Sequence, residues 1–139
     1  MKLDVVLRVV TKLMLPFMLV FAVYVQFHGD YGPGGGFQAG VIAAAALILY
    51  ALMFGLTSAM RVVPTWLVEK MIPVGVMIYG GTGVVSMFLH ENFLNYDALD
   101  HHHTVHAQEW GVFLVEVGVF VTVSSTMIAI FYAFGGRGR

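Results

Sequence analysis

Apolar residues dominate the chain in four long runs that are separated by short polar segments. In the 139 residues, the runs with few or no charges cover residues 5–27, 36–60, 66–89 and 107–134. A hydrocarbon core about 30 Å thick is crossed by about 20 helical residues, so each run can span it. Backbone groups in lipid must be satisfied within their own segment. The pattern therefore predicts an all-α integral membrane bundle of four transmembrane helices, a single membrane domain over residues 1–139.

The composition agrees with a membrane protein and excludes several soluble functions. Hydrophobic residues make up 59% of the chain, charged residues 11%, and the mean hydropathy is +0.84. That is more apolar surface than one aqueous core can hide. A formal net charge of −1 provides no field that would attract nucleic acid or acidic substrates. Cysteine is absent, which excludes disulfides, thiolate metal sites and thiol catalysis.

The basic residues all fall on one side of the predicted membrane. The seven Lys and Arg residues lie at the termini or beside the loop between the second and third helices: Lys2, Arg8, Lys12, Arg61, Lys70, Arg137 and Arg139. The other two loops, residues 28–35 and 90–106, contain none. Because short loops rich in Lys and Arg stay on the cytoplasmic side, we expect both termini to lie in the cytoplasm.

Glycine is frequent inside the second and third predicted helices, at Gly40, at Gly75 and in the segment Gly80-Gly81-Thr82-Gly83. Small residues let membrane helices approach closely, and close helix packing is the main expectation. The alternative is a third helix that is locally unwound around residues 80–83, as in transporters with broken helices.

A polar turn leads directly into the second helix, with the sequence His28-Gly-Asp-Tyr-Gly-Pro-Gly-Gly-Gly-Phe37. Pro33 fixes its own φ, whereas glycines permit positive φ and a close approach by another segment. The consecutive glycines of the turn are Gly34, Gly35 and Gly36. The Lys-Ser/Thr ending of a phosphate-binding loop is missing, which argues against nucleotide binding. The segment is either a tight structural turn or a contact surface, and His28 and Asp30 are its candidates for an ion pathway.

Glu116 lies well inside the otherwise apolar fourth helix. Insertion scales put a mid-helix acidic residue at about 2.5–3.5 kcal/mol, so such groups face protein or water and often belong to ion pathways. The alternative is a neutral, hydrogen-bonded carboxylic acid that joins two helices. Glu109 precedes Glu116 by two helical turns on the same face, so we expect a polar seam that contains both carboxyls.

A cluster of histidines, His101-His102-His103 with His106, precedes the fourth helix. Such a cluster is a candidate for a divalent metal site. Consecutive histidines cannot all point at one ion, which favours a solvated polar loop. No metal site and no cofactor are therefore predicted, and a membrane metalloprotein stays as an alternative.

The turn and the helix after it resemble the MnhB/MrpB family, a small subunit of the multisubunit Mrp-type (Mnh) cation/proton antiporters. The likeness rests on Pro-Gly-Gly-Gly-Phe at Pro33 to Phe37, followed by Ala39, Gly40 and alanines at 43–46. It extends to the short length, the four predicted helices and the basic N-terminus. The family usually begins this turn with Gly-His-Asn and a short spacer, whereas this chain has His28-Gly29-Asp30-Tyr31-Gly32. The resemblance implies that Pro33 and Phe37 are functionally important.

The resemblance also implies a function without enzymatic activity. We expect an accessory subunit of a hetero-oligomeric Na⁺/H⁺ antiporter complex in a bacterial or archaeal cell membrane, beside large antiporter-like subunits. It would support assembly or line the cation route. Two alternatives stay open: the related subunit of a membrane-bound hydrogenase-type complex, and an autonomous small homo-oligomeric transporter that uses Glu116 as its proton and substrate carboxylate.

Overall fold

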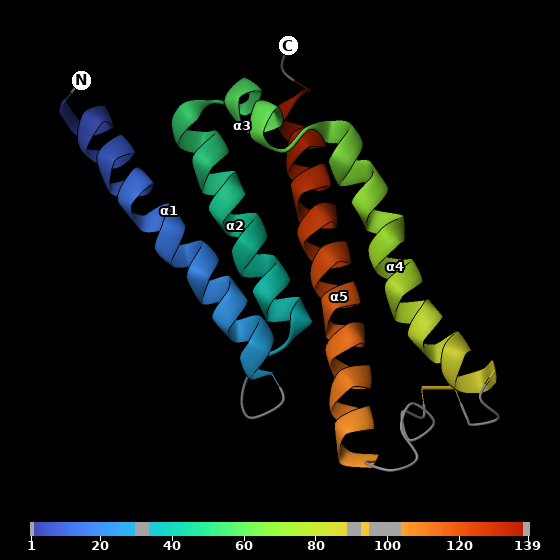
Figure 1. Ribbon diagram of the computed structural model, residues 1–139. Coiled ribbons are helices and arrows are strands. Elements are labelled where there is room, and N and C mark those ends of the chain that lie inside the picture. Colours follow the sequence, from blue (N-terminus) through green and yellow to red (C-terminus); the bar gives the residue numbers. More distant parts are fainter. Residues whose placement is uncertain (1, 30–33, 89–92, 95–103, 138–139) are drawn as a thin grey trace.

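The computed structural model describes residues 2–29, 34–88, 93–94 and 104–137. Over these residues the chain is helical, with α1 (Lys2–His28), α2 (Gly36–Phe54), α3 (Leu56–Val62), α4 (Thr65–Phe88) and α5 (Thr104–Gly135) (Figure 1). Among the described residues, 4 segments are long and apolar enough to cross a membrane: Asp4–His28, Gly36–Phe54, Thr65–Phe88 and Glu109–Gly135. The predicted all-α fold with four membrane spans is confirmed.

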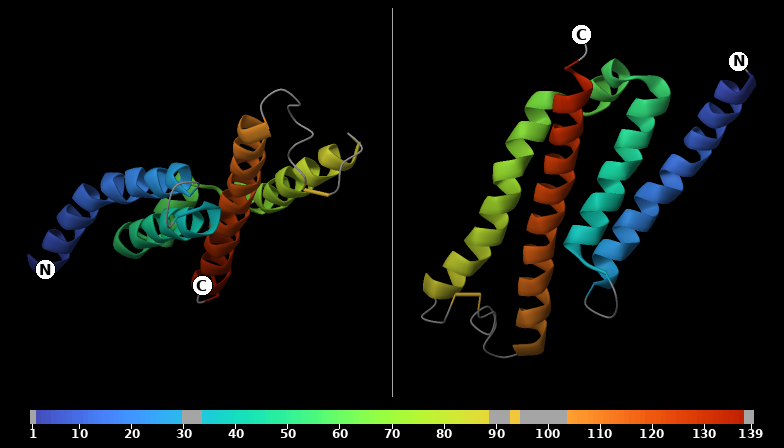
Figure 2. Two further views of the ribbon diagram at one scale, coloured as in Figure 1. Left: turned by 90° about the horizontal axis from the view of Figure 1, so that it is seen from below. Right: turned by 180° about the vertical axis from the view of Figure 1, so that it is seen from behind.

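The four spans form an open row in the order α1, α2, α5, α4 (Figures 1 and 2). α2 and α5 are the central pair, α1 packs along α2, and α4 packs along α5. α1 and α4 lie at opposite ends of the row, and both chain termini lie at the same end of the spans (Figure 2). Each outer helix therefore has one packed face and a large exposed apolar surface.

The prediction of one continuous helix over residues 36–60 is wrong. α2 ends at Phe54 and α3 begins at Leu56, because Gly55 between them has φ 97° and ψ 149°. A positive φ is accessible to glycine without the steric penalty that a Cβ atom imposes. The chain changes direction at this glycine, and the short α3 then leads into α4.

Buried side chains near the end of the molecule that carries the termini join α2, α3, α4 and α5. This cluster consists of Ala44, Ala51, Ala59, Val68, Ile128 and Tyr132. The hydroxyl of Tyr132 donates a hydrogen bond of 2.9 Å to the backbone carbonyl of Val63. The bond satisfies both a buried phenol and a carbonyl at the end of α3, and it ties that connection to α5.

Glycine packing holds α4 against α5. A Cβ atom added to Gly75 would overlap the hydroxyl of Thr122 and lie 2.6 Å from the carbonyl oxygen of Gly118. A Cβ atom added to Gly118 would in turn lie 2.8 Å from the carbonyl oxygen of Gly75. The two helix backbones are thus in direct contact, and the expected close packing is confirmed at Gly75.

The glycines further along α4 have different surroundings. α4 runs without interruption through residues 80–83, so the local unwinding that the glycines offered as an alternative does not occur. Gly83 packs against the ring of Phe93. A Cβ atom on Gly80 or Gly81 would meet none of the described residues within 4 Å, so they leave this part of the helix surface open.

We predict that Gly75→Ala destabilises the α4–α5 contact by about 1–3 kcal/mol, because the added methyl group presses on backbone atoms that cannot move away. The measurement is the thermal midpoint of the detergent-solubilised protein, followed by size-exclusion chromatography. Gly80→Ala is the matched control, and we expect an unchanged or slightly higher midpoint. Equal midpoints for the two variants would contradict this packing.

Candidate functional site

The glycine-rich turn closes directly over Glu116 of α5. A Cβ atom added to Gly29 would lie 2.8 Å and 2.9 Å from the two carboxyl oxygens of Glu116. A Cβ atom on Gly35 would lie 3.2 Å from one of the same oxygens. At Gly36 the added atom would overlap the backbone carbonyl oxygen of Glu116. Only residues without a side chain allow α5 to come this close to the turn.

The backbone of the turn is folded back onto the end of α1. Gly35 has φ 127° and ψ 173°, a conformation that favours glycine. Its N–H donates a hydrogen bond of 3.3 Å to the carbonyl of Val25, and its own carbonyl accepts one of 3.1 Å from Ala39. A Cβ atom on Gly34 would lie 2.8 Å from the Val25 carbonyl oxygen. The last turn of α1 and the first turn of α2 are therefore joined through glycine.

The contact between α2 and α5 continues one helical turn deeper. A Cβ atom added to Gly40 would lie 3.0 Å from the carbonyl oxygen of Phe120 and 3.1 Å from the Cβ of Val123. Gly36 and Gly40 are thus spaced by four residues, as are Glu116 and Phe120 on the facing helix. The two glycines form one stripe of backbone contact along the central helix pair.

Gln26 is a polar residue of this region that is absent from the predicted site. Its side chain is 7% exposed, and within the described part of the chain neither its Oε1 nor its Nε2 has a hydrogen-bond partner. Burying an amide without such bonds costs about 1–3 kcal/mol on protein mutational data. Gln26 lies in the last turn of α1, three residues before Gly29 and next to Val25, whose carbonyl accepts the hydrogen bond from Gly35. The only feature of the sequence that could have pointed to Gln26 was the presence of a single amide side chain in an apolar helix.

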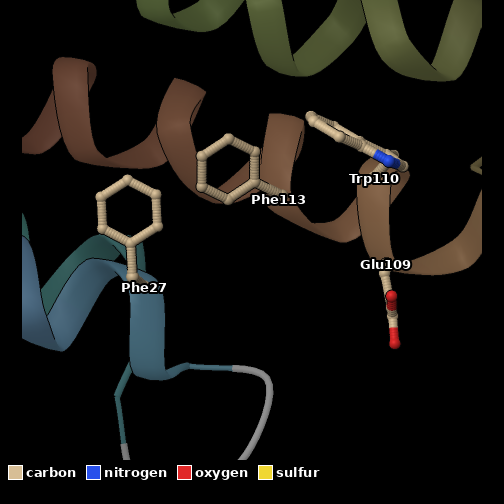
Figure 3. Close-up of a pocket in the computed structure, with 4 residues that line it drawn as sticks. All are labelled: Phe27, Glu109, Trp110 and Phe113. Atoms are coloured by element: carbon tan, nitrogen blue, oxygen red, sulfur yellow. The ribbon is translucent and has the colours of Figure 1, made fainter. Parts of the chain in front are cut away.

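Glu109 lies on α5 two helical turns before Glu116. It lines a hollow of about 290 Å³ together with Phe27, Trp110 and Phe113, and its carboxyl group points away from the Phe113 and Trp110 rings (Figure 3). The rings of Phe27 and Phe113 stack with centroids 5.4 Å apart. Phe113 falls between Glu109 and Glu116 along α5. The stacked rings join α1 to α5 beside Glu109, and the polar seam that would contain both carboxyls stays a prediction.

The other predicted site residues are placed in different ways. The ring of His28 stacks on Tyr24 with centroids 5.2 Å apart, and Phe37 at the start of α2 is 61% exposed. Asp30 and Pro33 lie outside the described residues, as do the side chains of the predicted histidine cluster at positions 101–103 and 106. Within the described part of the chain, no three His, Asp or Glu residues are grouped as a metal site would require.

Comparisons with known proteins identify the chain's relatives. A family model described as "Domain related to MnhB subunit of Na+/H+ antiporter" matches residues 6–129, a region that contains the glycine-rich turn and Glu116. The chain is 39% identical over 129 residues to "Putative antiporter subunit mnhB2" of Staphylococcus epidermidis (strain ATCC 12228 / FDA PCI 1200). Identity to the proteins of the same name is 37% in Staphylococcus haemolyticus (strain JCSC1435) and 36% in Staphylococcus aureus (strain Newman). Each alignment covers 86% of this chain and 91% of the relative.

The two kinds of contact at Glu116 predict different sensitivities to a methyl group. Gly36→Ala overlaps the backbone carbonyl of Glu116 and should destabilise the protein by about 1–3 kcal/mol, whereas Gly29→Ala meets the Glu116 carboxyl group, which can rotate away, and the Gly35 Cα at 2.9 Å, and should cost less. The measurement is again the thermal midpoint in detergent. Gly81→Ala, on an open helix surface, serves as the control and should leave the midpoint unchanged. A Gly36→Ala protein as stable as this control would show that α2 and α5 are further apart.

Proposed function

Because the chain belongs to the MnhB family of Na⁺/H⁺ antiporter subunits, we propose that it is an accessory subunit of a multisubunit complex that exchanges Na⁺ for H⁺. Its place would be the cell membrane of a bacterium or archaeon, beside larger antiporter-like subunits. There it supports assembly and borders the cation route. The observation that carries this proposal is a carboxyl group, Glu116, held within a membrane span by the backbone of the family's glycine-rich turn.

The open row of helices supports a role inside a larger assembly. α1 has a long apolar surface that is not covered by the rest of the chain: Leu13 is 65% exposed, Phe17 65% and Val20 68%. α4 likewise exposes Met77 at 73%. In a membrane such surfaces contact either lipid or the helices of other subunits. The described helices form an open row and not a closed bundle, an arrangement suited to complete a path that larger neighbours provide.

Within this proposal Glu116 is the central group of the ion pathway. A carboxyl at this depth is costly to insert into lipid, so it faces protein or water, and such groups often belong to ion pathways. Glu109 and His28, near the same end of the spans, would connect it to the aqueous phase, together with Asp30, which follows Gly29 in the sequence. Phe37 is exposed in the first turn of α2, where we propose that it contacts a neighbouring subunit.

We also propose that both termini lie in the cytoplasm. The termini and α3 share one end of the spans (Figure 1). The basic residues of the described chain gather at that end, at Arg8, Lys12, Arg61, Lys70 and Arg137. The bias of Lys and Arg toward cytoplasmic loops supports this orientation.

The proposed role predicts that the chain, tagged and gently extracted from its native membrane, co-purifies with larger hydrophobic subunits. Native mass spectrometry identifies the partners. The isolated chain in proteoliposomes should show little Na⁺/H⁺ exchange, because its helices enclose no complete path. Robust exchange by the chain alone, without co-purifying subunits, would contradict the accessory role and favour a small autonomous transporter.

The absence of cysteine from the sequence makes the orientation directly testable. We expect Trp110→Cys, near the outer end of α5, to react with a membrane-impermeant maleimide added to intact cells. Arg137→Cys should react only after the membrane is permeabilised. The reverse pattern of labelling would overturn the proposed orientation.

A further inference from the structure

We propose that Glu116 and Gln26 together form a binding site for a small hydrated monovalent cation, either Na⁺ or a protonated water. The site lies where α1, α2 and α5 meet beneath the glycine-rich turn. This inference rests on the proposed function and adds to it a second site residue and the chemical class of the ligand.

The placement of the two groups follows from the contacts around the turn. Gly29 touches the carboxyl group of Glu116, and the Val25 carbonyl, next to Gln26 in sequence, accepts the hydrogen bond from Gly35. Gln26 lies in the last turn of α1, which ends at His28 immediately before Gly29. Both polar groups therefore belong to the same three-helix junction.

The directions of the two helices place the polar groups at successive depths. α1 and α5 run antiparallel (Figure 1), and Cα–Cβ bonds tilt toward the N-terminus of their own helix. The side chain of Glu116 is accordingly directed to the turn, where its oxygens meet Gly29 and Gly35. The side chain of Gln26 is directed away from the turn, into the membrane. Counting from the turn into the membrane, the carboxyl group of Glu116 thus comes first and the amide of Gln26 second.

The chemistry of the two side chains matches a hydrated monocation. Carboxylate and amide oxygens are the ligands that hard cations take in proteins. Gln26 is buried and has neither its acceptor nor its donor bound by the described protein atoms. A cation with its water satisfies both, because the cation or a water hydrogen meets Oε1 while a water oxygen accepts from Nε2. The negative charge of Glu116 supplies the electrostatic attraction.

The central experiment exchanges the two functional groups within the intact antiporter complex. Glu116→Gln and Gln26→Leu are each made alone, and the double variant Glu116→Gln/Gln26→Glu keeps one carboxyl and one amide in the junction. Thr11→Val removes a different buried polar group from α1 and is the control. Co-purification of the subunits is measured first, so that a failure of assembly is distinguished from a failure of the site.

Exchange is then measured in proteoliposomes as a function of Na⁺ concentration and pH. Glu116→Gln should lower exchange by about tenfold or more, which is the scale for loss of one charged partner, and Gln26→Leu should lower it by a smaller factor. The double variant should recover severalfold over Glu116→Gln, and Thr11→Val should match the wild type. An increase of the apparent KM for Na⁺ at fixed pH would identify Na⁺ as the ligand, whereas a displaced pH profile at saturating Na⁺ would identify a protonated water.

Two results would overturn the site. One is a Gln26→Leu complex that assembles and has an unchanged KM and pH profile. The other is a double variant no more active than Glu116→Gln. If Gln26→Leu prevents assembly, Gln26→Met, a closer match in shape, replaces it. A second measurement needs no substitution: Na⁺ or added acid should change the rate at which a hydrophobic carbodiimide labels Glu116 in the wild-type complex, and a rate independent of both would refute the site.

Discussion

The backbone of α5 at Glu116 lies directly against the glycines that begin α2, and the whole arrangement of helices depends on this contact. α2 and α5 are the central pair of the row, with α1 attached to one and α4 to the other. Gly36 meets the backbone of Glu116, and Gly40 meets that of Phe120. In lipid there is little hydrophobic attraction between helices, so such close backbone packing is what holds the two halves together.

The same contact explains how an acidic group is accommodated within a membrane span. The carboxyl group of Glu116 meets the backbone of Gly29 and Gly35, which is polar, in place of lipid tails. A side chain at either position would push the carboxyl group away or cover it. The glycines therefore serve close packing, and in the proposed function the same glycines would hold the carboxyl group that handles the ion.

Much of the fold was predictable because the length of an apolar run determines whether it can span a bilayer. The break at Gly55 was not, since a single glycine in an apolar run does not reveal its φ. Nor was the order of the helices in the row predictable: α2, one of the central pair, is apolar around its circumference, so no stripe indicates which face meets which neighbour. Gly75 and Gly80 look alike in sequence, yet one packs against α5 and the other is open.

Part of the candidate site was likewise predictable from the sequence, and part was not. Glu116 could be identified because a charge in an apolar helix is conspicuous, and the turn because of its consecutive glycines. The contact between Glu116 and the turn depends on how the helices pack, and no feature of the neighbouring sequence indicates it. Gln26 was missed because an uncharged amide near a helix end resembles an ordinary interfacial residue, and only its burial without a partner sets it apart.

The most direct test of a cation-handling role for Glu116 is an infrared difference spectrum of the intact complex, recorded between Na⁺-containing and Na⁺-free buffer. We expect a carboxyl band that disappears in Glu116→Gln and shifts in Gly29→Ala, because the added methyl group touches the carboxyl oxygens. Identical spectra for the wild type and both variants would show that Glu116, held under the glycine turn, takes no part in handling the ion.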